Sequence, residues 1–193
     1  MGPPRILAFA GSARIDSYNK KLIKIAVEGA RLAGAEVTLL DLRDYPMPLY
    51  DGDLESSEGL PPNALKLKEI FIAHHGLLIA SPEYNSSVTP LLKNTLDWVS
   101  RPASKEEASL ACYEGKTAAL MSASPGALGG LRGLVHLRAI LGNIRVLVIP
   151  DQIAIIKAHE AFNPDGSLKE TRSQSAVQKL GETLVRITAR ISV

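Results

Sequence analysis

Residues 5–12 have the sequence RILAFAGS, in which a short apolar run ends at Gly11 and Ser12. A run of this length that is stopped by glycine is typical of a buried β-strand. Beyond it, apolar residues recur at spacings of three and four between positions 22 and 33, which predicts an amphipathic helix that Gly34 can close. The chain therefore begins with a strand, a polar loop and a helix.

The same alternation continues along the rest of the chain. We predict four further strands, at residues 36–41, 76–81, 117–122 and 145–149. Helical patterns cover residues 63–73, 89–98, 131–141 and 177–191. Residues 42–62 are rich in proline and acidic residues, and we interpret them as a long loop with one irregular turn at most.

Five apolar runs separated by helices predict the fold class. Strands of a parallel sheet that helices cover on both faces are nearly continuous apolar runs. The pattern therefore predicts an α/β fold, a doubly wound five-stranded parallel sheet in a three-layer sandwich. Right-handed crossovers favour the strand order 2-1-3-4-5. A length of 193 residues without a linker or repeat fits one domain spanning residues 1–193.

Composition disfavours several classes of function. With 22 basic and 20 acidic residues the formal charge is +2, which is too balanced to indicate a nucleic acid or a membrane surface as partner. Cys112 is the only cysteine, so an intramolecular disulfide is impossible. The N-terminal sequence lacks the pattern of a secretory signal peptide. Both observations fit a cytoplasmic location. The histidines show no metal-ligand spacing, and we expect no metal site.

The predicted topology indicates where a ligand would bind. Doubly wound sheets bind ligands beyond the carboxyl ends of their strands, at the point where the strand order reverses. In the predicted order this point lies between strands 5–10 and 76–81. The loops of interest are therefore residues 11–19 and 81–87, with residues 122–130 beside them.

The first of these loops, GSARIDSYN at residues 11–19, is rich in hydrogen-bond donors. The hydroxyls of Ser12 and Ser17, the guanidinium of Arg14, the amide of Asn19 and the start of a helix would together suit a phosphate. The loop has neither a GxxxxGK[ST] nor a GxGxxG pattern, which argues against nucleotide hydrolysis and a Rossmann dinucleotide site. An ordinary helix cap by Ser17 or Asn19 is the alternative interpretation.

The other two loops are polar as well. In SPEYNSS, residues 81–87, Pro82 stops a strand, the backbone after it could line the edge of a planar ligand, and Tyr84 could lie against a ring. SASPGALGG, residues 122–130, combines hydroxyls with glycines that allow close approach of a ligand. Each could be an ordinary surface loop, but three at one sheet edge favour a binding site.

Three segments of the chain resemble the NADPH-dependent FMN reductase family, which includes chromate and quinone reductases. GSARIDSYNKKL resembles its GSxRxxSxN segment, and SPEYNSSVTPLLKNTLDWVSRP resembles its PEYNxSxxxxLKNxxDWxSR segment. SASPGALGGLRGLVHLRAILG is similar to its third loop and the following helix. The matches follow the family's order from about Leu7 to Pro150. The resemblance implies a flavodoxin-like fold with FMN and NAD(P)H as cofactors.

The resemblance also implies a role for particular residues. The positions that match the FMN phosphate loop are Ser12, Arg14, Ser17 and Asn19. The positions that match the loop holding the isoalloxazine and ribityl portions are Pro82, Glu83, Tyr84 and Asn85. Ser124 and Gly126 match the loop beside the ring. Many members have glycine where this chain has Ser86, and serine is less free to adopt a positive φ, so we expect this turn to differ in detail.

A helix in the second segment is implied to make subunit contacts and to fix the second loop. The matching residues are Lys93, Asn94, Asp97 and Trp98. Apolar Leu91, Leu92, Leu96 and Val99 could form the contact in a homodimer or homotetramer, or could instead face the chain's own sheet.

The implied function is an FMN-dependent NAD(P)H oxidoreductase that passes hydride to bound FMN and then reduces a small acceptor by a ping-pong cycle. The acceptor would be a quinone, chromate, an azo compound or free flavin. FMN carries this chemistry itself, so we name no catalytic residue. Arg14 or Arg101 could attract the 2′-phosphate of NADPH or an anionic acceptor, although a surface ion pair is the commoner role for such an arginine.

Two alternatives remain open at this point. One is a flavodoxin-like electron-transfer or regulatory protein that binds FMN without nicotinamide turnover, and the formal charge of +2 argues against it because such carriers tend to be acidic. The other is a flavin-free α/β binding domain of the response-regulator type. That type needs an acidic cluster after the first strand, where this chain has Gly11 and Ser12.

Overall fold

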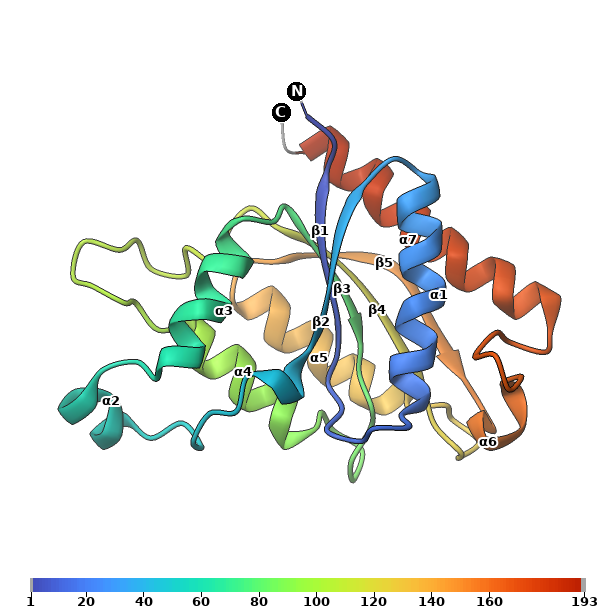
Figure 1. Ribbon diagram of the computed structural model, residues 1–193, viewed down its shortest axis with the longest axis horizontal. Coiled ribbons are helices and arrows are strands. Elements are labelled where there is room, and N and C mark those ends of the chain that lie inside the picture. The colour runs from blue at the N-terminus through green and yellow to red at the C-terminus, as the bar shows by residue number, and fades with distance from the viewer. Residues whose placement is uncertain (1, 192–193) are drawn as a thin grey trace.

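A single five-stranded sheet runs through the computed structural model, which describes residues 2–191 (Figure 1). Its strands are β1 (Arg5–Ala10), β2 (Glu36–Asp41), β3 (Gly76–Ala80), β4 (Thr117–Ala123) and β5 (Leu147–Ile155). They lie in the order β2-β1-β3-β4-β5, and every neighbouring pair is parallel. The predicted sheet topology is confirmed.

Helices cover both faces of the sheet, which gives three layers (Figure 1). On one face lie α1 (Tyr18–Leu32) and α7 (Thr171–Ile191), and on the other lie α3 (Pro62–Ile72), α4 (Pro90–Ser100) and α5 (Leu131–Asn143). Side chains alternate along each strand between two apolar cores. In β1, Ile6 and Ala8 face the α1 and α7 layer, whereas Leu7 and Phe9 face the other.

Three short helices lie in segments where the sequence analysis predicted none. The predicted loop at residues 42–62 contains a 3-10 helix, η1 (Leu42–Asp44), and a helix, α2 (Gly52–Glu58), so the expectation of one irregular turn was wrong. The side chain of Asp41 caps η1 and that of Asp51 caps α2, each accepting a hydrogen bond from the amide two residues ahead. A further short helix, α6 (Ala158–Ala161), follows β5.

The two edge strands differ from their predicted form. β2 is largely exposed, so it is not a strand buried on both faces. β5 continues to Ile155, beyond its predicted end at residue 149. Its pairing register with β4 shifts between Ala118 and Leu120, and Pro150 lies opposite this irregularity. Proline is tolerated there because an edge strand with a bulge does not need its missing N–H group.

Helices α1 and α7 touch through their backbones. A Cβ atom added at Gly29 of α1 would lie 2.0 Å from the carbonyl oxygen of Gln178, and one added at Gly181 of α7 would lie 2.1 Å from that of Ala26. Glycine at both positions lets the two helices approach more closely than any side chain would permit.

No helix within residues 2–191 is both long and apolar enough to cross a membrane.

Replacing Gly29 with alanine is expected to lower the free energy of unfolding by about 3 kcal/mol, because the methyl group would overlap a backbone carbonyl that cannot move alone. Urea unfolding measures the change. The matched control is Gly142→Ala in α5, where no atom lies within 4 Å of the added Cβ. That variant should be neutral or more stable by up to about 1 kcal/mol. Equal effects of the two variants would contradict the close-contact interpretation.

Candidate functional site

Three loops begin side by side at the carboxyl edge of the sheet, the lower edge in Figure 1. They are the first loop (residues 11–17), the second loop (residues 81–89) and the third loop (residues 124–130). Backbone hydrogen bonds continue beyond the strands, from the Gly11 amide to the Ala80 carbonyl at 2.9 Å and from the Ser81 amide to the Met121 carbonyl at 2.8 Å. The structure thus brings together the three loops that the sequence singled out.

The first loop leaves the positive end of α1 open to an anion. Ser12 and Ser17 are buried, and Arg14 is exposed. Ser17 is the N-cap of α1, yet within residues 2–191 its side chain forms no capping hydrogen bond, and the first turn of the helix has no acidic residue. Asp16, directly before Ser17, pairs with Lys21 at 2.6 Å. A helix N-terminus without a side-chain cap attracts negative charge. The arrangement therefore fits a phosphate group.

Asn19 is engaged elsewhere in the protein. Its Nδ2 donates a hydrogen bond to the Ala123 carbonyl at 2.9 Å, and its Oδ1 accepts one from the Ala123 amide at 3.0 Å. Ala123 is the last residue of β4, just before the third loop. The sequence indicated that Asn19 could donate to a phosphate, which stays a prediction; in the structure its amide joins α1 to β4.

A tight turn forms the tip of the second loop. Tyr84 and Ser87 exchange two backbone hydrogen bonds of 3.0 Å, and between them Asn85 and Ser86 have φ angles of 49° and 68°. Two consecutive positive φ angles define the type I′ turn of a two-residue hairpin. Ser86 therefore adopts the conformation that glycine favours, although it is serine. The turn leaves Tyr84 48% exposed, so its side chain is accessible to a ligand.

Glu83 points away from the turn and caps α5. Its carboxylate, 8% exposed, accepts hydrogen bonds from Nε and Nη2 of Arg132 at 3.0 and 2.5 Å and from the Gly133 amide at 3.1 Å. Burial by itself would raise the pKa of the Glu83 carboxyl, but the bonds from Arg132 and Gly133 outweigh it and hold that pKa below its ordinary value. Glu83 is therefore a fixed anion that ties the second loop to α5.

Sequence reasoning missed Thr89, which connects the first and second loops. Its Oγ1 donates to the Gly11 carbonyl at 2.6 Å and accepts from the Leu92 amide at 3.2 Å, so one buried hydroxyl also caps α4. A threonine followed by proline at the first helical position is a recognisable N-cap signal. The bond to Gly11 had no such signal, because it joins residues 78 positions apart.

The third loop packs closely against the end of β5. Gly129 and Gly130 have φ angles of 61° and 92°, and a Cβ at Gly129 would lie 2.8 Å from the Ile155 carbonyl carbon. The Ser124 hydroxyl accepts from the Gly126 amide at 3.3 Å, and Gly126 itself is exposed. The glycines therefore shape the loop, and its outer part around Gly126 is open to a ligand.

Residues of α4 hold a neighbouring segment of the same chain. The Trp98 indole and the Asn94 amide both donate to the Pro48 carbonyl at 2.8 Å. Arg101 forms a two-bond ion pair with Glu55 of α2, at 2.9 and 3.0 Å. Arg101 thus has the ordinary ion-pair role. The apolar stripe of α4 faces the chain's own sheet, where Leu92, Leu96 and Val99 are buried.

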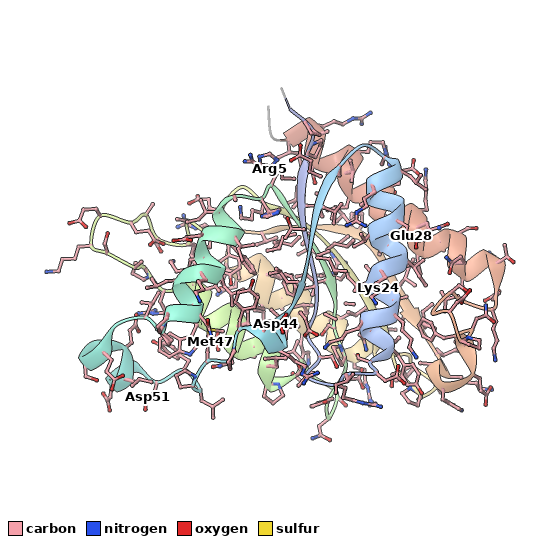
Figure 2. The ribbon with its side chains drawn as sticks, in the orientation of Figure 1. Arg5, Lys24, Glu28, Asp44, Met47 and Asp51 are labelled. Carbon is pink, nitrogen blue, oxygen red and sulfur yellow. The ribbon has the colours of Figure 1, made fainter. Side chains whose placement is uncertain are left out.

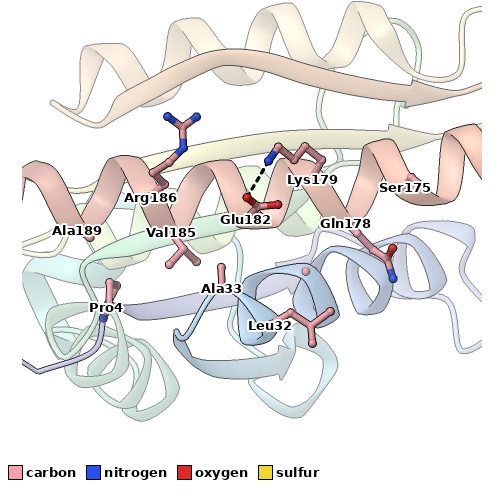
Figure 3. Close-up of a pocket in the computed structure, with 11 residues that line it drawn as sticks. Pro4, Leu32, Ala33, Ser175, Gln178, Lys179, Glu182, Val185, Arg186 and Ala189 are labelled. Atoms are coloured by element: carbon pink, nitrogen blue, oxygen red, sulfur yellow. Dashed lines mark hydrogen bonds and ion pairs between the residues drawn. The ribbon is translucent and has the colours of Figure 1, made fainter.

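Several cavities adjoin α1, and one of them borders the first loop. It has a volume of about 470 Å³ and is lined in part by Ile15, Ser17, Lys20 and Asp41. A groove of about 630 Å³ runs between α1 and α7 and includes Pro4 and Ala33 (Figure 3). Pro4 precedes β1 and Ala33 follows α1, so this groove lies at the opposite end of the sheet from the three loops. We therefore place the candidate site at the loops.

Comparison with known proteins assigns this arrangement to a family. The model of the family described as NADPH-dependent FMN reductase matches residues 4–160. An NAD(P)H-dependent FMN reductase of Pseudomonas aeruginosa is 33% identical over 176 residues, which cover 91% of this chain and 90% of that protein. The chain belongs to the NADPH-dependent FMN reductase family. The resemblance noted in the sequence is confirmed.

Two further comparisons support the assignment of this chain to the FMN reductase family. A probable NADPH:quinone oxidoreductase of Oryza sativa subsp. japonica is 36% identical over 169 residues, covering 85% of this chain and 78% of that protein. The structure of FerB, a flavoenzyme NAD(P)H:(acceptor) oxidoreductase of Paracoccus denitrificans, matches with a TM-score of 0.80 and 27% identity, covering 97% and 98% of the two chains. The flavodoxin-like fold, the oxidoreductase class and the family's cofactors, FMN and NAD(P)H, are confirmed.

Replacing Ser86 with glycine is expected to raise the free energy of unfolding by about 0.5 kcal/mol, because glycine relieves the strain of a positive φ angle but loses more entropy on folding. Thermal unfolding of the two proteins measures the gain. Ser175→Gly in α7, at an exposed helical position, is the control and should lose up to about 1 kcal/mol. A loss at position 86 as large as the loss in the control would contradict the expectation.

Replacing Glu83 with glutamine is expected to lower the free energy of unfolding by about 1–2 kcal/mol at pH 7, because α5 loses an anionic cap. The folded-state pKa of Glu83 is lowered, so its contribution is complete above the ordinary pKa of a glutamate and is lost as the pH falls through the folded value. The difference from wild type should therefore shrink below about pH 4.

Urea unfolding of wild type and Glu83→Gln between pH 7 and pH 3 measures this difference in the free energy of unfolding. Glu114→Gln is the control, since Glu114 pairs with Arg145 at an exposed site where both side chains are more than half accessible. Its effect should stay below about 1 kcal/mol at every pH. A difference for Glu83→Gln that is independent of pH would show that the negative charge is not what stabilises the contact.

Proposed function

We propose that the chain is an FMN-dependent NAD(P)H oxidoreductase that reduces a small acceptor, with quinones as the first class to test. The observation that carries the proposal is the open N-terminus of α1 at the same sheet edge as the half-exposed Tyr84 ring. The first feature suits a phosphate and the second a flat aromatic ring, and FMN combines the two. The naming of relatives as quinone oxidoreductases supports the choice of acceptor.

The residues present fit FMN in three groups. Ser12, Arg14 and Ser17 would hold the phosphate at the start of α1. Pro82, Tyr84 and Asn85 would lie along the ribityl and ring portions, with Ser124 and Gly126 beside the ring. Asn19 and Glu83 contribute by fixing these loops, since their polar atoms already bind Ala123, Arg132 and Gly133.

The chain itself supplies binding and orientation rather than acid or base chemistry. When bound, FMN accepts a hydride from the reduced nicotinamide and returns two electrons to the acceptor. Glu83 is the only carboxylic acid within the second loop, and its three hydrogen bonds keep it ionised, so it is unsuited to donate a proton. We therefore assign no catalytic side chain.

Nicotinamide and acceptor would use the same exposed surface in turn. Tyr84 and Gly126 lie on two of the loops at this edge, and both are exposed. One open surface shared by two substrates fits a ping-pong cycle. Quinones, chromate, azo compounds and free flavin would be reduced there, and Arg101 would serve as the ion-pair partner of Glu55 rather than as a contact for an anionic acceptor.

We also propose a homodimer or homotetramer, with α5 in the contact. The apolar stripe of α4 is buried, but α5 exposes Leu131 by 40% and Val135 by 58%. The single cysteine, Cys112, is buried and free of a disulfide, which supports a cytoplasmic location. Both apolar cores draw on elements from the two halves of the sequence, which supports one domain over residues 1–193.

The test is NAD(P)H oxidation by the FMN-loaded protein with a panel of quinones, chromate, azo dyes and free flavin. Parallel lines in double-reciprocal plots are expected for a ping-pong cycle. Arg14→Ala should weaken FMN binding by about tenfold, because one charge-assisted contact to the phosphate is lost, and should leave riboflavin binding unchanged. Arg31→Ala, at the other end of α1, is the control and should change neither affinity.

Two results would overturn the proposal. A protein that takes up no FMN and oxidises no NAD(P)H in its presence is not a reductase of this type. A protein that binds FMN but never oxidises NAD(P)H would be the electron-transfer or regulatory protein of the alternative hypothesis. Equal losses of FMN and riboflavin affinity in Arg14→Ala would place the phosphate elsewhere.

A further inference from the structure

A buried side chain bridges two loops of the site that are far apart in the sequence. Asn19 is 3% exposed, and its amide group makes both a donor and an acceptor bond to Ala123, 104 positions along the chain. Asn19 is the second residue of α1, directly after the first loop, and Ala123 directly precedes the third loop. We call this pair of hydrogen bonds the Asn19 clamp.

The clamp takes the place of a missing strand. Met121 of β4 directs its carbonyl toward β3, where it accepts from the Ser81 amide. Alternate residues of a strand direct their backbone groups to the same side, so the N–H and C=O of Ala123 face the same way as those of Met121. The paired register of β3 and β4 ends at Ala80 and Met121, two residues before Ala123, so β3 offers Ala123 no partner. The Asn19 amide supplies both the acceptor and the donor that a longer neighbouring strand would otherwise offer to Ala123.

We propose that Asn19 is a positioning residue that fixes the first loop relative to the third loop, so that the two halves of the FMN site are held in place before the cofactor binds. This inference rests on the proposed function, and it gives Asn19 a role different from the phosphate contact that the family resemblance implies. A preformed site binds more tightly because the ligand does not have to order the loops.

Neighbouring contacts hold the second loop but do not replace the clamp. The Thr89 hydroxyl joins the second loop to Gly11, and the Glu83 carboxylate joins it to α5. Neither contact connects the first loop to the third. The Asn19 clamp is thus the side-chain link between the segment that would hold the phosphate and the segment that would lie beside the ring.

The first test uses the flavin-free protein and the variant Asn19→Ala. A clamp exists without ligand, so its loss leaves buried backbone groups of Ala123 unpaired and should lower Tm by about 4–10 °C. Hydrogen exchange at the Ala123 amide should become faster. A residue that only binds phosphate would change neither quantity in the absence of FMN.

The second test separates positioning from general stability. Thr188→Val removes a buried hydroxyl that bonds Thr117 at 2.5 Å and the Leu184 carbonyl at 2.8 Å, at the other end of the sheet. It should lower Tm as well but leave FMN affinity unchanged. Asn19→Ala should weaken FMN binding by about tenfold or more, because the loops are no longer held together.

The variant Asn19→Asp provides a conservative rescue. A neutral carboxylic acid has one donor and one acceptor in nearly the same arrangement as the amide, whereas a carboxylate has only acceptors. Burial raises the pKa of the introduced carboxyl, so its stabilising contact is present at low pH and is lost as the pH rises through that pKa. The Tm deficit relative to wild type should therefore be smaller at pH 5 than at pH 8, while that of Asn19→Ala should not depend on pH.

Each contrary outcome has a distinct meaning. If Asn19→Ala weakens FMN binding but leaves the Tm of the flavin-free protein unchanged, Asn19 is a direct ligand and the proposal is wrong. If Thr188→Val weakens FMN binding as much as Asn19→Ala does, the effect is one of general stability and the proposal is again wrong. A wild-type protein that binds no FMN instead contradicts the proposed function itself, and the positioning role falls with it.

Discussion

A buried backbone N–H or C=O group must find a partner, and this requirement governs the carboxyl edge of the sheet. The strands there end at different heights, and helices α4 and α5 begin with unpaired amides. Side chains supply the partners: Asn19 pairs with β4 and Glu83 with α5 from distant segments, and Thr89 caps its own helix α4 while it also bonds Gly11. The bonds that complete these elements therefore also assemble the three loops into one site.

The polar residues of the site fall into two groups, those bonded within the protein and those left exposed. Asn19, Glu83 and Thr89 are used within the protein, and their roles do not depend on a ligand. Arg14 and the Tyr84 ring remain exposed at the same edge. A cofactor that brings its own redox chemistry needs a surface of this kind, with rigid loops and accessible contacts, and does not need a chain of proton-transfer groups.

The sequence predicted those elements whose ends are marked by the residues next to them. The bounds of β1 and β2 were correct because apolar runs with clear ends define them. The prediction ended β5 too early because a proline such as Pro150 usually ends a strand. The strand continues because Pro150 lies at a bulge in an edge strand. The roles of Asn19 and Glu83 could not be derived, because their partners lie 104 and about 50 positions away and no spacing rule connects such residues. Arg101 illustrates the same limit, since Glu55 lies in a helix that was taken for a loop.

The backbone contact between α1 and α7 has a consequence for the order of assembly during synthesis. α1 precedes α7 by most of the other elements of the fold, yet Gly29 and Gly181 let each helix pack directly against the other. α1 cannot reach its final packing until α7 has been synthesised, after all five strands. The loop that precedes α1 therefore gains its final support only once α7 is in place.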